Sequence, residues 1–287
     1  MSDLSIIKLS NRATKEFWEI PVLFEDEHLL AISKPAKLLS SPDRYDAERP
    51  NLMRLLHTGI TEGKPWAKAR GLTYLMNAHR LDFETTGIML LAKSKPVMVA
   101  LANLFGSEKP AKTYIALAQG QAALNAWETD AAIAMHPLKV GFWRVDPKGG
   151  KCSRTRFEVI EQFRRVVLLK CHPLTGRTHQ IRVHLKHCKL PICGDALYGG
   201  RNLWLSSLKP DYRLKPGAEE RPLISSVALH AEKLELPHPV TGALVSITAE
   251  WPKDLRVAVK YLRLYGRGSH AAGPAEEEHP EPMEPME

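Results

Sequence analysis

One segment of this chain places a carboxylate beside a guanidinium in a setting suited to chemistry. Residues 79–87 read His-Arg-Leu-Asp-Phe-Glu-Thr-Thr-Gly, and the apolar run at 87–92 is typical of a buried strand. The carboxylate of Asp82 would then lie where a loop enters that strand. A group in this position forms a structural ion pair, or it acts as a nucleophile or base. The segment alone favours the ion pair, and the other segments reverse that preference.

The charge of the chain indicates a polyanionic partner. The 287 residues carry a formal net charge of +8, but residues 271–287 hold six Glu and no Lys or Arg. Residues 1–270 therefore carry a net charge of +14. A body this basic is typical of proteins that bind nucleic acid. The alternative is a basic protein with no such partner.

Nothing in the sequence indicates export or membrane insertion. The first twenty residues mix charged residues with short apolar pieces and contain no signal-peptide core. No apolar run approaches the roughly 20 residues that a membrane span needs. Four cysteines in 287 residues do not make a disulfide framework, which favours reduced thiols. We therefore expect a cytoplasmic protein without membrane contact.

The order of expected elements predicts an α+β fold. We expect a short leader at 1–20, one folded domain at 21–270 and a disordered acidic tail at 271–287. Strands outnumber helices and mostly follow one another directly, which favours a largely antiparallel or mixed sheet. The pattern predicts strands at 22–24, 29–32, 87–92, 113–118, 157–160, 166–171, 226–236 and 244–250, helices near 52–56, between a Ser94 cap and Gly106, at 179–188 and at 253–265, and a surface insertion at 201–225.

Further segments can be weighed together with 79–87. Residues 112–117 read Lys-Thr-Tyr-Ile-Ala-Leu, and residues 174–185 read Leu-Thr-Gly-Arg-Thr-His-Gln-Ile-Arg-Val-His-Leu. The others are residues 25–42 with Lys-Pro-Ala inside, Pro-Ile-Cys-Gly-Asp at 191–195, Tyr-Gly at 198–199, and residues 229–242 from Leu-His-Ala to Val-Thr-Gly. In this order and spacing the set resembles the RluA-type family of RNA pseudouridine synthases, from about residue 21 to about residue 257.

The resemblance implies an activity and a fold. The family isomerises uridine in RNA to pseudouridine: the N1–C1′ bond breaks, the uracil turns, and it rejoins the sugar through C5. The implied fold is the pseudouridine synthase fold, a long, bent, mixed or mostly antiparallel sheet flanked by helices and loops. The active-site cleft of this fold crosses the middle of the sheet. The resemblance also implies an enzyme that needs neither metal nor organic cofactor. We expect a monomer that acts on a stem-loop of rRNA or tRNA, and the stretch before residue 21 leaves no room for an S4 RNA-binding domain.

The same resemblance implies three catalytic residues. Asp82 matches the family's catalytic aspartate, as nucleophile or as base. Arg182 matches the cation that keeps this carboxylate ionised, since burial favours a neutral carboxyl and a neighbouring cation opposes that effect. Tyr114 matches the tyrosine that stacks on the flipped uracil near C5. The alternatives are a solvated helix face for Arg182 and simple strand packing for Tyr114.

Basic residues around these three are expected to hold the RNA. A stacked base is out of reach, so the target nucleotide must leave the stack. By the resemblance Arg80 fills the gap that it leaves; the alternative is a salt bridge to Glu84. Expected phosphate contacts, which give affinity but little sequence choice, are Lys34, Lys112, Arg154, Arg177, His179 and Lys186.

Two departures from the family pattern and two other kinds of site bear on this interpretation. Lys37 stands where a glycine usually follows Lys-Pro-Ala, and Thr86 stands where serine is common. The spacing of His184, His187 and Cys188, with Cys193 beyond, could suit zinc, but no paired Cys-x-x-Cys motif supports a metal site. A serine hydrolase lacks its Gly-x-Ser-x-Gly elbow. The main alternative is a non-catalytic RNA-binding protein on the same fold.

Overall fold

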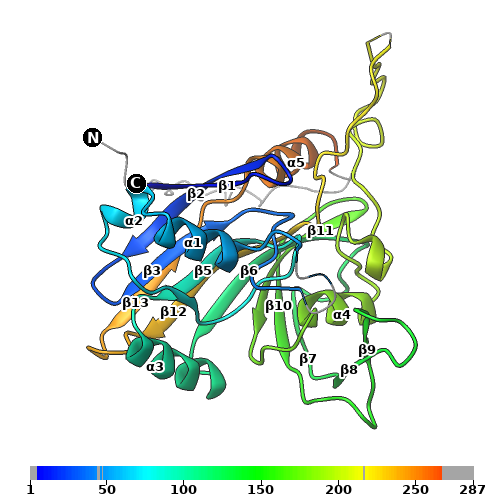
Figure 1. Ribbon diagram of the computed structural model, residues 1–287. Coiled ribbons are helices and arrows are strands. Elements are labelled where there is room, and N and C mark those ends of the chain that lie inside the picture. Colours follow the sequence, from blue (N-terminus) through cyan, green and yellow to red (C-terminus); the bar gives the residue numbers. More distant parts are fainter. Residues whose placement is uncertain (1–4, 44–45, 47, 216, 267–287) are drawn as a thin grey trace, which may run out of the picture.

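The fold is organised around one large sheet. The computed structural model describes residues 5–43, 46, 48–215 and 217–266, and Figure 1 shows the arrangement. The sheet has eleven strands in the order β1-β2-β3-β5-β12-β6-β11-β10-β7, with β13 beside β12 and β4 beside β5. Strands β8 and β9 form a separate pair. The strands are β1 (Ile6–Asn11), β2 (Glu16–Glu25), β3 (Leu29–Lys34), β4 (Met76–Asn77), β5 (Thr86–Ala92), β6 (Ala111–Gln119), β7 (Ala126–Thr129), β8 (Ile133–Met135), β9 (Trp143–Val145), β10 (Thr155–Gln162), β11 (Val166–Pro173), β12 (Leu229–Pro237) and β13 (Leu244–Thr248).

Antiparallel pairing dominates this sheet. Only β5 and β12 run parallel among the paired strands that the structure describes. Their close approach depends on Gly87, which has a φ of 109° and whose Cβ, if it had one, would meet the carbonyl of Ala231. The predicted α+β class with a mostly antiparallel, mixed sheet is confirmed.

Helices cover both faces of the central strands (Figure 1). In β5, Ile88 and Leu90 pack in a cluster with α3, while Met89 and Leu91 pack in a cluster with α1 and α2. A strand buried on both faces is a continuous apolar run, which is why the sequence predicted this strand well. The helices are α1 (Leu52–Thr61), α2 (Pro65–Lys68), α3 (Lys95–Gly106), α4 (Gln180–His187), α5 (Lys253–Tyr265) and the 3-10 turn η1 (Ala196–Tyr198).

Several expected boundaries were wrong. The supposed leader at 1–20 contributes β1 and the start of β2, because Ile7, Leu9 and Ile20 alternate with polar residues and are buried. Strands β7, β8 and β9 are only three or four residues long and were not expected from the sequence. Gly106 is the last residue of α3 rather than the residue after it. The predicted tail at 271–287 lies outside the described residues.

No helix in the described part of the chain is both long enough and apolar enough to span a membrane.

Candidate active site

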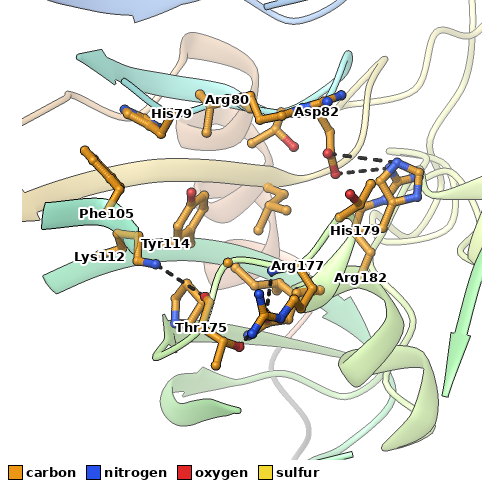
Figure 2. A pocket seen from close by; sticks show the side chains of 18 of the residues that line it. His79, Arg80, Asp82, Phe105, Lys112, Tyr114, Thr175, Arg177, His179 and Arg182 are labelled. Carbon is orange, nitrogen blue, oxygen red and sulfur yellow. Dashed lines mark hydrogen bonds and ion pairs between the residues drawn. The ribbon is translucent and has the colours of Figure 1, made fainter. Parts of the chain in front are cut away.

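A pocket lies where the loop before β5 faces β6, the end of β11 and the start of α4. Its cavity has a volume of about 320 Å³, near the lower end of the range for small-molecule pockets, about 300–1,000 Å³. Figure 2 shows Asp82, His179 and Arg182 on one side, with His79, Phe105, Lys112 and Tyr114 on the other. The cavity can therefore hold one group of about nucleotide size.

An ion network joins α4 to the loop that carries Asp82. Arg182 is 6% exposed and donates from Nε and Nη2 to the two carboxylate oxygens of Asp195, at 2.7 and 2.9 Å. Its Nη1 donates to Asp82 Oδ2 at 3.3 Å. Burial opposes the charge of Arg182, but Asp195 and then Asp82 outweigh burial and raise the pKa of the guanidinium. Arg182 is therefore a fixed cation against Asp82 and lies away from the solvated helix face.

His179 completes this side of the pocket, and the buried Tyr198 contacts it from outside the pocket. His179 precedes α4 with a left-handed φ of 55°, and its Nε2 lies 3.9 Å from Asp82 Oδ1. Its Nδ1 is 2.8 Å from the hydroxyl of Tyr198, which also accepts from the backbone N–H of Trp143 at 3.1 Å. Burial lowers the pKa of His179, although Asp82 opposes the shift. The imidazole is thus a neutral hydrogen-bonding group near pH 7.

Tyr114 and Lys112 point from β6 into the same cavity because they are two residues apart on one strand. Burial, and then the nearby charge of Asp82, raise the pKa of the Tyr114 phenol. The phenol therefore stays protonated at neutral pH. Burial also lowers the pKa of Lys112, whose Nζ donates to the carbonyl of Thr175 at 3.3 Å.

The far end of the pocket combines aromatic and charged groups. The rings of His79 and Phe105 stack with their centroids 5.0 Å apart. His79 Nε2 accepts from the N–H of Leu90 at 3.0 Å, and burial lowers the pKa of this imidazole to about 4. The His79 ring is therefore neutral and fixed.

Arg177 forms an ion pair with Glu108 at 3.8 Å, which connects the loop after β11 to the turn after α3.

The other predicted RNA contacts fall at different places. Arg80 is exposed and lines the pocket, and within the described residues it forms no salt bridge with Glu84. Arg177 lines the pocket, and Lys186 is exposed on α4 with its Nζ 5.4 Å from the centre of the Phe142 ring. Arg154 is exposed beside the first residues of β10 and lies 3.5 Å from Glu128.

The prediction for Lys34 was wrong. Its side chain is fully buried, and its Nζ donates to the carbonyls of Pro35, Leu38 and Phe83 at 2.7, 2.8 and 3.3 Å. A residue enclosed in this way cannot reach a phosphate. Burial lowers the pKa of Lys34 to about 7, although Asp82 opposes the shift.

The buried ammonium of Lys34 predicts a pH dependence of stability. The unfolded chain holds this proton up to about pH 10.5, whereas the folded chain releases it near pH 7. The free energy of unfolding should therefore rise with pH between these values. Urea unfolding at pH 7, 8.5 and 10 should show the rise in the wild type and a smaller one in Lys34→Met. Equal slopes in the two proteins would contradict the assignment.

Asp195 and Tyr198 were not assigned a role from the sequence. Both lie in segments that carried the family resemblance, yet their residue types gave no hint of a contact with Arg182. Asp195 is 1% exposed, and the Tyr198 ring centre lies 4.9 Å from Arg182 Cζ. Burial raises the pKa of Tyr198 to about 12, partly offset by its backbone hydrogen bond from Trp143. Asp195 thus fixes the Arg182 guanidinium by two hydrogen bonds, and the Tyr198 ring packs against it.

Two of the residues considered for zinc, His184 and Cys188, have other partners. His184 Nδ1 is 2.9 Å from the Thr155 hydroxyl, and its Nε2 is 2.9 Å from the carbonyl of Ala131. Cys188 Sγ is 3.3 Å from the Thr129 hydroxyl. Among the described residues, no group of three or more His, Cys, Asp or Glu side chains could hold a metal ion.

Comparisons with known proteins identify the class. The family model described as RNA pseudouridylate synthase matches residues 28–187. Ribosomal large subunit pseudouridine synthase D of Xanthomonas campestris pv. campestris is 32% identical over 277 residues, covering 90% of this chain and 74% of that protein. The protein of the same name from Escherichia coli K12 is 31% identical over 264 residues, covering 89% of this chain and 75% of that one.

Solved structures agree on the fold. The human protein RNA pseudouridylate synthase domain containing 4 aligns with a TM-score of 0.63 at 23% identity, covering 84% of this chain and 92% of that chain. Human RNA pseudouridylate synthase domain containing 1 gives 0.60 at 20% identity, with 87% and 96% covered. The fold is therefore the pseudouridine synthase fold. The chain belongs to the RluA-type family of RNA pseudouridine synthases, and it is an isomerase that acts on RNA.

Proposed function

We propose that this enzyme converts a uridine of large-subunit ribosomal RNA to pseudouridine, with Asp82 as the catalytic residue. The substrate class is supported by the relatives named ribosomal large subunit pseudouridine synthase D, which match most of this chain. The role of Asp82 is supported by one observation above the others. Its carboxylate faces a nucleotide-sized cavity and is paired, at 3.3 Å, with a buried arginine whose charge Asp195 fixes.

The reaction places specific demands on these residues. As the N1–C1′ bond breaks, the sugar loses the electron pair of that bond to the uracil. The ionised Asp82 supplies electrons, either by bonding to the sugar as a nucleophile or by taking a sugar proton as a base. The uracil then turns and C5 bonds to C1′. In the nucleophile route the Asp82–sugar bond breaks in this step, and in the base route Asp82 returns the sugar proton. The C5 hydrogen then leaves as a proton, and N1 takes up a proton. Arg182 holds the carboxylate of Asp82 in place at the cavity, with its Nη1 3.3 Å from Asp82 Oδ2.

Tyr114 serves as a surface for the turning uracil. Its phenol is held neutral by burial and by Asp82, so it adds no second negative charge beside that carboxylate. An aromatic ring in the wall of the cavity can stack on a base at a gain of about 1–3 kcal/mol. Stacking without fixed hydrogen bonds permits the base to rotate between the bond-breaking and bond-forming steps.

The nucleotide enters the cavity by leaving the RNA stack. Arg80 is exposed at the pocket beside Asp82 and can fill the vacated position with its planar guanidinium. Arg177, Lys112 and Lys186 supply positive charge toward the phosphates. His179, being neutral, contributes hydrogen bonds in place of charge. The monomeric state and the cytoplasmic location stay predictions.

Nucleoside analysis tests the substrate class. Unmodified large-subunit rRNA and unmodified tRNA transcripts are incubated separately with the enzyme, digested to nucleosides, and separated by chromatography. We expect pseudouridine in the rRNA alone, at one or a few positions that can then be mapped. Pseudouridine in tRNA alone would overturn the assignment of rRNA as the substrate, and the isomerase activity would still stand.

A further inference from the structure

Two hydrogen bonds connect a buried serine to the residue immediately before Asp82. Ser40 is 3% exposed, and its hydroxyl donates to the carbonyl of Leu81 at 2.7 Å. The same oxygen accepts from the N–H of Leu81 at 3.1 Å. A hydroxyl is both donor and acceptor, so one side chain satisfies both backbone groups of Leu81, which is itself buried.

The segment that carries Ser40 also holds the residue after Asp82. Lys34 Nζ donates to the carbonyl of Phe83 at 3.3 Å. Asp82 therefore lies between two residues whose backbones are held by side chains of the segment 34–40, which begins with the last residue of β3. Its carboxylate meets Arg182 of α4 on the other side. The position of Asp82 thus depends on a backbone support as well as on its ion pair.

We propose that Ser40 is a positioning residue for the isomerisation, which fixes the backbone of Leu81 and thereby aims Asp82 at the nucleotide in the pocket. The proposal rests on the catalytic role of Asp82. Reacting groups must be held within a fraction of an ångström, and a displacement of about 1 Å costs roughly 10²-fold in rate. Ser40 is buried and does not line the pocket. Its loss therefore acts on the rate of the chemical step and leaves RNA binding intact.

The test compares three substitutions of Ser40 with one at Ser41. Ser40→Ala removes both hydrogen bonds to Leu81. Ser40→Thr retains the hydroxyl, and Ser40→Cys fills a similar space with a weak hydrogen-bonding group. Ser41→Ala is the matched control, because the Ser41 hydroxyl lies 3.5 Å from Asn77 Oδ1 and is not bonded to Leu81. Each variant is assayed for kcat and KM on RNA and for its urea unfolding midpoint.

We expect kcat to fall about 10- to 100-fold in Ser40→Ala, with KM within about twofold of the wild type. Ser40→Cys should be intermediate, and Ser40→Thr and Ser41→Ala should stay near the wild type. If Ser40→Ala does not fold, Ser40→Cys decides the matter. A folded Ser40→Ala or Ser40→Cys enzyme with the wild-type kcat, whatever its unfolding midpoint, would overturn the proposal and leave Ser40 a purely structural residue.

Amide hydrogen exchange separates this proposal from the proposed function. The N–H of Leu81 should exchange slowly in the wild type and at least about tenfold faster in Ser40→Ala, because its acceptor is gone. An equal exchange rate would overturn the positioning role even if the wild type proved inactive on every RNA. An inactive wild type would in turn contradict the proposed function alone.

Discussion

Arg182→Met should lower the free energy of unfolding by about 3–5 kcal/mol and abolish activity. The substitution leaves Asp195, which is 1% exposed, without the two guanidinium hydrogen bonds that now satisfy it. This buried carboxylate would keep only its hydrogen bond from the backbone N–H of Tyr198, at 3.3 Å, and a buried charge that loses its ionic partner is strongly destabilising. Asp82 loses its cation at the same time. Urea unfolding and a pseudouridine assay on the same preparation measure the two effects.

A double variant separates the structural role of Arg182 from its catalytic role. Arg182→Met/Asp195→Leu removes both buried charges, and replacing a buried ion pair with apolar residues is often close to neutral for stability. We expect this variant to recover most of the lost stability and none of the activity, since Asp82 still lacks its cation. Recovery of activity along with stability would show that Arg182 only supports the fold.

Asp82→Asn should lower kcat by about 10²–10⁴-fold or more, because the amide can act neither as a nucleophile nor as a base. The shape of the side chain is nearly unchanged, and Arg182 keeps its bidentate bonds to Asp195. The fold and the affinity for RNA should therefore be retained. Single-turnover assays and filter binding on one RNA would measure both quantities.

Glu84→Gln provides the matched control for this loss. Glu84 is on the same loop two residues later and does not line the pocket. Burial raises the pKa of its carboxyl, with Arg182 opposing the shift. Its conversion to an amide should leave kcat within a few fold of the wild type. Equal losses in Asp82→Asn and Glu84→Gln would point to loop charge in general and away from catalysis by Asp82.

The parts of the fold that the sequence predicts are those with strong local signals. The strand expected at 87–92 holds the continuous apolar run 88–92, and the closing helix repeats Leu255, Val259 and Leu262 on its buried face. Strand β1 was missed because its apolar alternation is short and stands among charged residues. Strand β8 through Ile133, and strand β9 through Trp143 and Val145, join a cluster with Tyr198 of η1. No local pattern reveals this contact.

The family motif brought together three residues whose catalytic roles stay predictions, and the sequence did not reveal the residues that hold them. The residues matched to the family motif, Asp82, Tyr114 and Arg182, meet in one pocket. Asp195 was not assigned because its pairing with Arg182 depends on how the chain returns after α4. Lys34 was placed on the surface because lysine usually lies there, whereas three carbonyls enclose it. Such interactions are set by tertiary structure and leave no trace in residue type or spacing.

Tritium release from C5-labelled uridine in rRNA, with wild type and Asp82→Asn side by side, tests the central claim most directly. The C5 hydrogen leaves only when C5 becomes the new glycosidic carbon. We expect stoichiometric release by the wild type and release at least about 10²-fold slower by Asp82→Asn, with RNA bound equally by both. Release at the same rate by both proteins would contradict catalysis by Asp82. No release by the wild type, with RNA bound, would favour a non-catalytic RNA-binding protein.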